Sequence, residues 1–418
     1  MLRVLTSLAL HWQILLALVL GSAAGLLLGD SVLAIGFFGD LFLKGLKMVI
    51  VPLISTSIIT GIAGLGSAGS MGRLGGKTAL YYTTTSLFAI LTGLVLVKLI
   101  RPGQGLDLGL VEQPERLVES MAKFGDGPWQ ALTRLLLDLV PANPIAAMAE
   151  GKMLQIIFFS ILLGYFITKA PERHRTTLEG FCRGLFEVVM HITHFVLTFA
   201  PLGIFALVAR TVATTGLEVF AGLGWYALTV FLGLVVHATI TLPMLLRLFG
   251  GLSPIRHAVA MSPALMTAFS TSSSSATLPL TLDSLENRAG VSNRVTSFVA
   301  PLGATVNMDG TALYECVAAI FIAQVYGIEL TFGQQFLVVI TALLASVGAA
   351  GIPMAGLVMI SVILTAVGLP LEGVGLIIAV DRVLDMCRTT VNVWSDSCGA
   401  GLIASTENEN LSGDRISE

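Results

Sequence analysis

The sequence predicts an all-α membrane protein, and composition is the first reason. The chain has 418 residues, of which 55% are apolar and only 12% charged, and its mean hydropathy is +0.88. These values lie far outside the range of soluble globular domains. The net charge of −3, without a basic cluster, gives no indication of a nucleic-acid partner.

Long apolar runs are the second reason. Residues 12–28 and 228–246 are long enough to cross a hydrocarbon core of ~30 Å as helices. A transmembrane barrel is not expected, because the chain lacks ten-residue segments of alternating polarity and has 21 Phe but only 4 Trp and 6 Tyr. In the first half of the chain we expect helices at residues 10–29, 36–64, 76–100, 130–168, 176–211 and 218–249.

Basic residues predict how these helices are oriented. Lys and Arg recur in alternate connections, as at Arg73 and Lys77 and again at Arg247 and Arg256. The positive-inside rule assigns those connections to the cytoplasm and the intervening ones to the outside. We therefore expect a multi-pass protein of the cell membrane, the inner membrane in a bacterium, with both termini cytoplasmic.

Two interrupted apolar segments are the third reason. Residues 261–282 are broken by a polar stretch at 270–275, and residues 336–367 are broken by a Gly-rich stretch at 348–356. Non-helical backbone at membrane depth is tolerated only where protein buries it or a cavity adjoins it, so each segment is expected to be a re-entrant hairpin. Corresponding broken segments in two halves of a chain indicate a transport site between inverted repeats.

The last apolar segment, residues 376–403, carries charges along one face. At 100° per residue, one stripe contains Asp381, Asp385, Arg388, Thr389, Asn392 and Asp396. A central Asp or Arg that faces lipid costs roughly 2.5–3.5 kcal/mol, so the stripe must face protein, water or a ligand. Neighbouring acidic and basic groups at this depth suit a small zwitterion or an ion.

Four consecutive serines, Ser272 to Ser275, fall at the expected tip of the first hairpin. Their hydroxyls and free backbone N–H groups could hold a carboxylate, and a flexible turn is the alternative. An intramembrane serine hydrolase is a further alternative. Because no Gly-x-Ser-x-Gly elbow surrounds these serines, we expect a protein that is not an enzyme.

Residues 307–311, Asn-Met-Asp-Gly-Thr, place amide, thioether and carboxylate groups at successive positions. An unwound turn would let these groups and its carbonyl oxygens surround a sodium ion, whereas a glycine kink without an ion is the alternative. Glu315 follows Thr311 by one turn, and burial favours its neutral form, as a proton carrier or as a hydrogen-bond donor. His237 is alone in an apolar span and is interpreted as a core histidine.

Four motifs together resemble one family. Residues 272–281 (SSSSATLPLT), 307–315 (NMDGTALYE), 348–356 (GAAGIPMAG) and 385–396 (DMCRTTVNVWSD) resemble the dicarboxylate/amino acid:cation symporters. The resemblance covers essentially the whole chain and is strongest from residue 260 onward. Within the family it is closest to the excitatory amino-acid transporter branch, and the lack of a long sequon-bearing insertion suggests a prokaryotic member.

The resemblance implies a homotrimer of eight transmembrane helices and two re-entrant helical hairpins per protomer, built from inverted repeats. A static scaffold would hold a transport domain that moves like an elevator. The implied division is scaffold helices 1–2 at residues 1–75, transport helix 3 and an extracellular connection at 76–128, scaffold helices 4–5 at 129–216, transport helix 6 at 217–250, the first hairpin at 251–288, helix 7 at 289–327, the second hairpin at 328–370, helix 8 at 371–404 and a cytoplasmic tail at 405–418.

The resemblance also implies a substrate site. Arg388 would bind the substrate's side-chain carboxylate, Asp385 its α-amino group and Asn392 its backbone groups. A guanidinium fork binds a carboxylate bidentately, and a buried Asp needs a cation. The remaining residues of the implied cage are Ser273, Ser274, Ser275, Thr311, Gly351, Ile352, Pro353, Gly356 and Thr389.

Two to three co-transported sodium ions are implied as well, with a proton as a further candidate at Glu315. One site would use Asp396 with Asn307 and Asn392. A second would use Tyr82, Thr85, Ser86, Asn307 and Asp309. A third would use the backbone carbonyls of Ser346, Val347 and Ala349 with Met308 nearby, and Gly303 and Thr305 belong to the same implied set of ion ligands.

The expected function is import of L-aspartate and L-glutamate, driven by a sodium gradient. A C4-dicarboxylate carrier, a neutral amino-acid symporter of the same fold and an ion channel are the alternatives. The chain departs from the family pattern at one point, because relatives carry an arginine in the first hairpin or directly after the helix-8 aspartate, where this chain has Ser272 and Met386. Arg382 is a candidate replacement, and potassium counter-transport stays open.

Overall fold

The computed structural model describes residues 10–65, 72–105, 137, 140–215, 218–348 and 355–407. Throughout these residues the regular elements are helical, which confirms the predicted all-α class. The longer elements are α2 (Leu10–Leu28), α3 (Gly36–Leu65), α4 (Gly72–Ile100), α7 (Pro144–Glu150), α8 (Met153–Lys169), α9 (Glu172–Thr198), α10 (Ala200–Thr215), α11 (Glu218–Val236), α12 (Leu242–Gly250), α13 (Pro254–Thr271), α14 (Ser274–Asp283), α15 (Asn293–Val306), α16 (Asp309–Val325), α17 (Phe332–Gly348), α18 (Ala355–Val367) and α19 (Val374–Thr406). Four short elements complete the description: η1 (Gly29–Ile35), η2 (His237–Thr241), η3 (Ser284–Arg288) and η4 (Leu371–Gly373).

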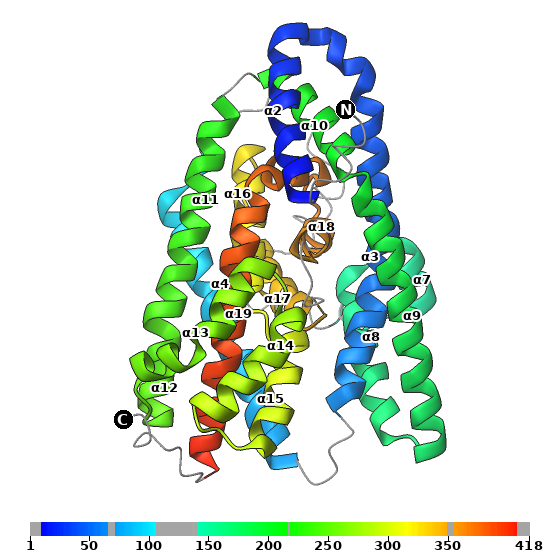
Figure 1. Ribbon diagram of the computed structural model, residues 1–418. Helices are drawn as coiled ribbons and strands as arrows, with labels where there is room; N and C mark the ends of the chain where they lie inside the picture. The colour runs from blue at the N-terminus through cyan, green and yellow to red at the C-terminus, as the bar shows by residue number, and fades with distance from the viewer. Residues whose placement is uncertain are drawn as a thin grey trace.

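The longest helix, α19, runs along the long axis of the molecule and is drawn orange to red in Figure 1. Helices α13, α15 and α16 pack against it, and α4 and α11 pack against α16. A second group, formed by α3, α8 and α9, lies to one side, while α2 and α10 form a pair at one end (Figure 1).

Among the residues that the structure describes, three helical stretches are long and apolar enough to cross a membrane: Arg73–Ile100, Gly222–Gly250 and Asn293–Val325. Shorter apolar helices include Leu16–Leu28 and Gln155–Lys169. Large apolar side chains also lie on the outer surface, as at Leu27, Leu80 and Leu248. Such a surface is favourable in contact with lipid and unfavourable in water.

Two helices predicted to be continuous are divided in the structure. One helix was expected over 130–168, whose first residues fall outside the described part of the chain, and the structure has α7 and α8 instead. Asn143 caps the start of α7 by accepting a hydrogen bond from Ile145 N at 2.9 Å. Gly151 ends α7 with φ 67°. The expected helix over 176–211 divides into α9 and α10, because Pro201 cannot continue the hydrogen-bond ladder of α9.

The first predicted hairpin is present as α13 and α14, which pack against each other. Ser272 ends α13 in the left-handed region at φ 53°, and Ser273 begins α14 by accepting a hydrogen bond from Ala276 N at 3.1 Å. The break therefore falls inside the predicted interval 270–275. The second hairpin consists of α17 and α18, also packed together, and its tip at residues 349–354 lies outside the described residues.

Between the hairpins, α15 and α16 form a helix that is interrupted at Asn307 and Met308. Asn307 has φ −104° and ψ 98°, and Met308 has φ −126° and ψ 60°, so neither residue is helical. The predicted unwound turn over 307–311 is thus shorter than expected, because Asp309 to Thr311 already belong to α16. The interruption directs the Asn307 and Asp309 side chains into the interior, where each is 0% exposed.

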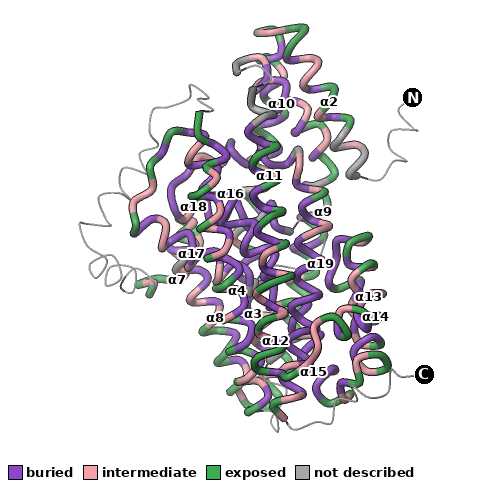
Figure 2. Tube along the Cα trace, turned by 90° about the vertical axis from the view of Figure 1, so that its left-hand side faces the viewer, coloured by how far each residue is buried: buried purple, intermediate pink, exposed green. Residues whose placement is uncertain are grey.

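The polar stripe of α19 is enclosed by protein. Figure 2 shows α16 and much of α19 as buried. Asp381, Asp385, Arg388, Thr389, Asn392 and Asp396 are between 1% and 5% exposed. The prediction that this stripe faces away from lipid is therefore confirmed.

The far end of α19 is fixed by a cluster of charges. Glu407, whose side chain is 1% exposed, accepts hydrogen bonds at 2.7 Å from both Arg73 and Lys77 of α4. Arg294 of α15 lies 3.5 Å from the same carboxylate. The hydrogen bond from Arg73, followed by that from Lys77, lowers the pKa of Glu407 to about 2.

This cluster predicts a pH-dependent contribution to stability. Because the pKa of Glu407 is lower in the folded protein than the usual value of about 4.3, its stabilising effect is complete above that value and is lost as the pH falls towards 2. We expect Glu407→Gln to unfold at a lower temperature than the parent at pH 7, and the difference to shrink between pH 5 and pH 3. Thermal unfolding in detergent measures this difference in unfolding temperature. The matched control is Glu150→Gln, which removes a single exposed ion pair with Lys152. A difference that stays constant down to pH 3 contradicts the assignment.

Candidate functional site

A buried arginine is the centre of the site. Arg388 is 1% exposed and donates from Nε to Asp385 Oδ1 and from Nη1 to Asp381 Oδ1, each at 2.9 Å. The three residues share one face of α19 because they are four and three positions apart. Nη2 also lies 2.9 Å from Asp385 Oδ1, but without hydrogen-bond geometry. One end of the guanidinium fork therefore retains donors for another acceptor.

Tyr314 of α16 covers one face of this guanidinium. The Arg388 Cζ atom lies 4.1 Å from the centre of the Tyr314 ring, and the Tyr314 hydroxyl donates to Asp381 Oδ1 at 2.6 Å. The ring and the two carboxylates hold the guanidinium in one orientation. Asp381 Oδ2 has no hydrogen-bond partner among the described residues.

Arg382 also reaches the site. Its Nη1 lies 3.8 Å from Asp385 Oδ2, and its side chain is 27% exposed. Asp385 therefore lies between two guanidinium groups, one buried and one partly open to solvent. Arg382, which the resemblance suggested as a replacement arginine, is thus within ion-pair distance of Asp385.

Two glycines allow other segments to approach Arg388. A Cβ atom at Gly356 of α18 would lie 2.8 Å from Arg388 Cζ, and one at Gly310 of α16 would lie 2.5 Å from the Arg388 carbonyl oxygen. No side chain fits at either position without displacing Arg388. The start of α18 thus rests directly on the guanidinium.

Asn392 connects α19 to the beginning of α16. Its Oδ1 accepts from Gly310 N at 2.8 Å, and its Nδ2 donates to Thr311 Oγ1 at 3.2 Å. Asn392 and Thr311 were both predicted to contact the substrate. In the structure they lie together, one turn of α19 beyond Arg388.

Asp309 is the centre of a second polar cluster. Its Oδ1 accepts from Ser86 at 2.6 Å and from Thr85 at 3.3 Å. Its Oδ2 accepts from Ser395 at 2.6 Å and lies 3.1 Å from His237 Nε2. Thr85, Ser86 and Asp309, predicted as ligands of one ion, are therefore in direct contact, whereas Tyr82 directs its hydroxyl to Val299 O at 2.8 Å.

His237 belongs to the Asp309 cluster and is more than the core histidine that the sequence suggested. It begins the short π-helical segment η2 and is 0% exposed. A π-helical turn shifts the register of a helix by one residue and is frequent at functional sites. The histidine interacts with Asp309 through Nε2, while Nδ1 has no partner among the described residues.

Asp396 forms a third polar cluster beside the second. Asn307 Nδ2 donates to Asp396 Oδ1 at 2.9 Å and to Ser395 Oγ at 3.0 Å, so one amide joins the two carboxylate clusters. Asn307 Oδ1 is buried without a partner among the described residues. A Cβ atom at Gly303 would lie 2.6 Å from the Tyr82 hydroxyl oxygen and still closer to Asp396 Oδ1. Gly303, Tyr82, Asn307 and Asp396 therefore meet at one point.

The two clusters contain the carboxyl groups of Asp309 and Asp396, and the basic side chain in contact with Asp309 is His237. Within the described part of the chain, no Lys or Arg nitrogen lies within 4.0 Å of Asp309 or Asp396. Both carboxylates are at most 2% exposed. A buried carboxylate without a cation is strongly unfavourable. Together with the unpartnered Asn307 oxygen, they form an oxygen-rich site that suits a hard monovalent cation.

Glu315 lies further along α16 and is 0% exposed, with both carboxyl oxygens lacking a partner among the described residues. Ser273 and Ser274 are buried at the first hairpin tip, whereas Ser275 is exposed. Thr389 is 5% exposed on the polar face of α19. Thr305 is exposed and donates to Leu302 O at 3.0 Å, away from the two carboxylates.

The third implied ion site is described only in part. Ser346 donates its hydroxyl to Leu343 O at 2.8 Å, and Met308 packs in an apolar cluster that includes Ala345 and Met359. Val347 is helical, but its side chain lies outside the described part, as do Ala349, Gly351, Ile352 and Pro353. These predictions stay predictions.

Four residues were missing from the predicted site: Asp381, Tyr314, His237 and Ser395. Asp381 belongs to the polar stripe that the sequence reveals, so its helical position was the available signal. Tyr314 and Ser395 lie beside predicted residues on their own helices. His237 is more than 70 positions away from Asp309 in the chain, and no local pattern predicts that they meet.

The pairing of Arg388 with Asp381 predicts a large energetic coupling. We expect Asp381→Asn and Arg388→Leu each to reduce stability by about 3–5 kcal/mol, since each leaves a buried charge with fewer partners. The double variant should lose clearly less than the sum, and thermal unfolding of all four proteins in detergent measures the difference. Tyr314→Phe, which removes one hydrogen bond to the same carboxylate, is the matched control, with an expected loss of about 1.5–3 kcal/mol. Additive losses would show that the pair is not coupled.

Comparison with known proteins identifies the family. A family model described as the sodium:dicarboxylate symporter family matches residues 10–406. The proton/glutamate-aspartate symporter of Escherichia coli (strain K12) is 37% identical over 410 residues, an alignment that covers 96% of this chain and 93% of that protein. Excitatory amino acid transporter 2 of Homo sapiens is 40% identical over 427 residues, covering 90% and 73%.

A third relative is the proton/sodium-glutamate symport protein of Geobacillus stearothermophilus, which is 33% identical over 404 residues, with coverage of 96% and 95%. The residues that the family model matches include all three polar clusters around α16 and α19. The chain belongs to the sodium:dicarboxylate symporter family.

Proposed function

We propose that this protein is a secondary active symporter that imports L-aspartate and L-glutamate, driven by the sodium gradient. The observation that carries this proposal is the buried Asp381–Asp385–Arg388 group, in which an arginine and two carboxylates are enclosed together. An acidic amino acid has a side-chain carboxylate that Arg388 can bind and an ammonium group that Asp385 can bind. The names of the E. coli and Geobacillus relatives support the same substrate class.

Substrate binding would replace the ion pair between Arg388 and Asp385 with two ion pairs, one between Arg388 and the substrate and one between Asp385 and the substrate. The substrate's side-chain carboxylate takes the free donors of Arg388 Nη2, while its ammonium group takes Asp385. Asp381 and Tyr314 keep the other end of the guanidinium in place during this exchange. Hydroxyl and backbone groups of Ser273 and Ser274 at the start of α14 hold the α-carboxylate.

Sodium ions would neutralise the two remaining carboxylates. One ion binds Asp309 with the hydroxyl oxygens of Thr85 and Ser86, and another binds Asp396 with the Asn307 amide oxygen. A third is proposed at the backbone carbonyls of Ser346, Val347 and Ala349. Each positive charge that moves inward gains about 2.3 kcal/mol per 100 mV of membrane potential, so two or three ions can drive steep accumulation of an anionic substrate.

The proposed architecture is a homotrimer of elevator-type protomers in the cell membrane, with both termini cytoplasmic. The transport domain would consist of α4, α11 to α19 and the two hairpins, and the scaffold of α2, α3 and α7 to α10. The packing of α13, α15 and α16 around α19, with α3, α8 and α9 grouped to one side, supports this division. The second hairpin, α17 and α18, would act as the external gate.

Two alternatives from the same fold are less well supported. A C4-dicarboxylate has no ammonium group with which to replace Arg388 at Asp385. A neutral amino acid has no second carboxylate for Arg388.

Two alternatives of other classes are also less well supported. A channel would not need buried carboxylates in contact with a substrate-binding arginine. An intramembrane hydrolase would need a nucleophile that Ser273, an N-cap residue, does not provide. Potassium counter-transport depends on whether Arg382 takes the role of the arginine that relatives carry nearby.

Uptake into proteoliposomes tests the proposal. We expect labelled L-aspartate to accumulate above equilibrium only with an inward sodium gradient, and Arg388→Ala to reduce apparent affinity by roughly 100-fold or more, since a charge-assisted bidentate pair is lost. Arg382→Ala, which removes a neighbouring cation that is partly exposed, is the matched control and should have a smaller effect. Parent-like aspartate uptake by Arg388→Ala would overturn the recognition model, and uptake that only equilibrates would favour a channel.

Glu315 offers a separate test of proton co-transport. A fully buried carboxyl group without hydrogen-bond donors is held at lower cost as the neutral acid, so Glu315 can carry a proton through the transport cycle. We expect Glu315→Gln, which is permanently neutral, to flatten the pH dependence of aspartate uptake between pH 5.5 and pH 8.5, conditions chosen for the assay. Cys316→Ser, a conservative change at the neighbouring position, should keep the parent profile. An unchanged profile in Glu315→Gln excludes Glu315 as the proton carrier.

A further inference from the structure

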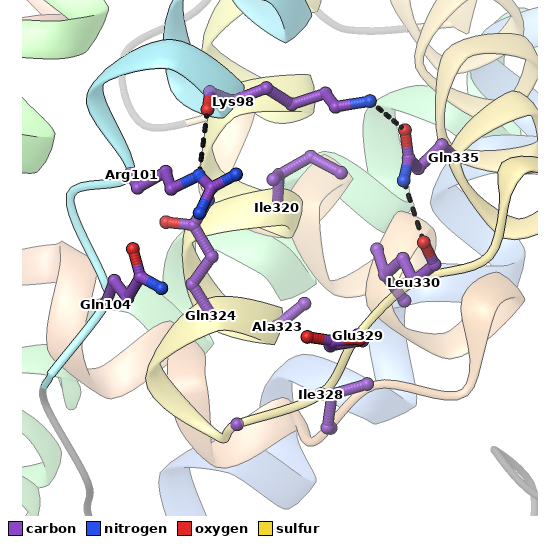
Figure 3. A pocket seen from close by; sticks show the side chains of 11 residues that line it. Lys98, Arg101, Gln104, Ile320, Ala323, Gln324, Ile328, Glu329, Leu330 and Gln335 are labelled. Carbon is purple, nitrogen blue, oxygen red and sulfur yellow. Dashed lines mark hydrogen bonds between the residues drawn. The ribbon is translucent and has the colours of Figure 1, made fainter.

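A separate pocket lies at the end of α4 that is opposite the Glu407 cluster. It has a volume of about 370 Å³, within the range of small-ligand pockets. Its polar lining consists of Lys98, Arg101, Gln104, Gln324, Glu329 and Gln335. Figure 3 shows Arg101 and Gln104 on one side of the pocket and Glu329 and Gln335 on the other. None of these residues belongs to the clusters around α16 and α19 described above.

The cationic side of the pocket is held by the backbone turn that follows α4. Arg101 has φ 51°, in the left-handed region, and its Nε donates to Lys98 O at 3.3 Å. Gln324 of α16 fixes this turn from the other side, donating to Val97 O at 3.2 Å and accepting from Gly103 N at 3.0 Å. Gln324, which itself lines the pocket, thus fixes the backbone that carries Lys98 and Arg101.

The charged groups of the pocket are not paired with one another. Over the described ranges, no ion pair within 4.0 Å involves Lys98, Arg101 or Glu329. The Lys98 Nζ atom donates only to Gln335 Oε1, at 3.0 Å (Figure 3). The Arg101 guanidinium therefore enters the pocket from the turn after α4, the Lys98 ammonium reaches across to Gln335, and one carboxylate, Glu329, also lines the pocket (Figure 3).

This arrangement matches a zwitterion. The Arg101 fork and the Lys98 ammonium suit an oxyanion, either carboxylate or phosphate, and Glu329 suits an ammonium group. Buried Ile320, Ala323 and Ile328 form the apolar part of the lining. Close to the pocket in sequence, Leu99 on α4 and Phe332 at the start of α17 are 76% and 66% exposed. Such exposed apolar side chains beside a cationic pair are typical of a surface that meets phospholipid.

From this geometry we infer that the pocket binds a group that combines an oxyanion with an ammonium. The headgroup of phosphatidylethanolamine has both, and so does a free acidic amino acid. Because Lys98 donates to Gln335 on α17, the occupant would contact the first arm of the second hairpin as well as α4. The inference does not depend on which substrate is transported through the central site.

Native mass spectrometry of the purified full chain tests the lipid source. The probes are phosphatidylethanolamine and phosphatidylglycerol, which has the phosphate but lacks the ammonium. We expect the parent to retain phosphatidylethanolamine preferentially, and Lys98→Gln with Arg101→Gln to lose about tenfold or more of that retention. Glu329→Gln should keep lipid binding but lose the preference between the two lipids. The matched control, Lys169→Gln with Arg173→Gln, removes two exposed cations elsewhere and should behave like the parent.

A second arm tests the free amino acid. In an Arg388→Ala background, where the central site is impaired, L-aspartate binding is measured by isothermal titration with and without the Lys98 and Arg101 changes. If the Arg388→Ala protein still binds L-aspartate and the Lys98 and Arg101 changes abolish that binding, the occupant of the pocket is a free amino acid and the inference is supported. If neither lipid retention nor aspartate binding depends on Lys98 and Arg101, or if Glu329→Gln alters neither the lipid preference nor aspartate binding, the inference is overturned.

Discussion

The enclosure of a guanidinium between two carboxylates on one helix is the constraint on which the rest of the interior depends. Arg388 is almost completely buried, and moving a charged group from water into a protein interior costs several kcal/mol unless it is paired and hydrogen-bonded. Asp381, Asp385 and the Tyr314 ring provide that compensation. Every helix that covers α19 must approach closely enough to exclude water and still leave these contacts intact. This requirement explains why Gly310 and Gly356 occur where backbone meets Arg388.

Among the described residues, the same interior contains more acidic than basic side chains. Asp309, Asp396 and Glu315 are buried, and in the region that the structure describes none has a Lys or Arg partner within 4.0 Å. Donors from Thr85, Ser86 and Ser395 reduce the cost for Asp309, but neutral donors do not neutralise a charge. An interior of this kind is most stable when it takes up cations or protons. Coupling between ions and an anionic solute is therefore a direct consequence of the charge distribution, because each lowers the cost of burying the other.

Much of this could be predicted from the sequence, and the reasons differ between elements. The polar stripe of α19 and the break between Ser272 and Ser273 follow from helical periodicity and from local residue preferences, which depend only on neighbouring positions. The division at Pro201 was missed even though proline was the available signal. The unwound turn was predicted too long, because it was expected to include every polar group from Asn307 to Thr311, whereas Gly310 lies in α16 where that helix meets the backbone of Arg388. His237 and Asp309 could not be paired, since their contact depends on how α11 and α16 pack and on the π-helical register of η2.

The contact between Gly356 and Arg388 has a consequence for how the two segments can move. A Cβ atom at Gly356 would lie 2.8 Å from Arg388 Cζ, so the first turn of α18 limits the space in which the guanidinium can change its rotamer. A change in the rotamer of Arg388 and a shift of the first turn of α18 are therefore coupled by direct contact. Any larger residue at this position would crowd the guanidinium, so that either the arm or the arginine side chain would have to shift.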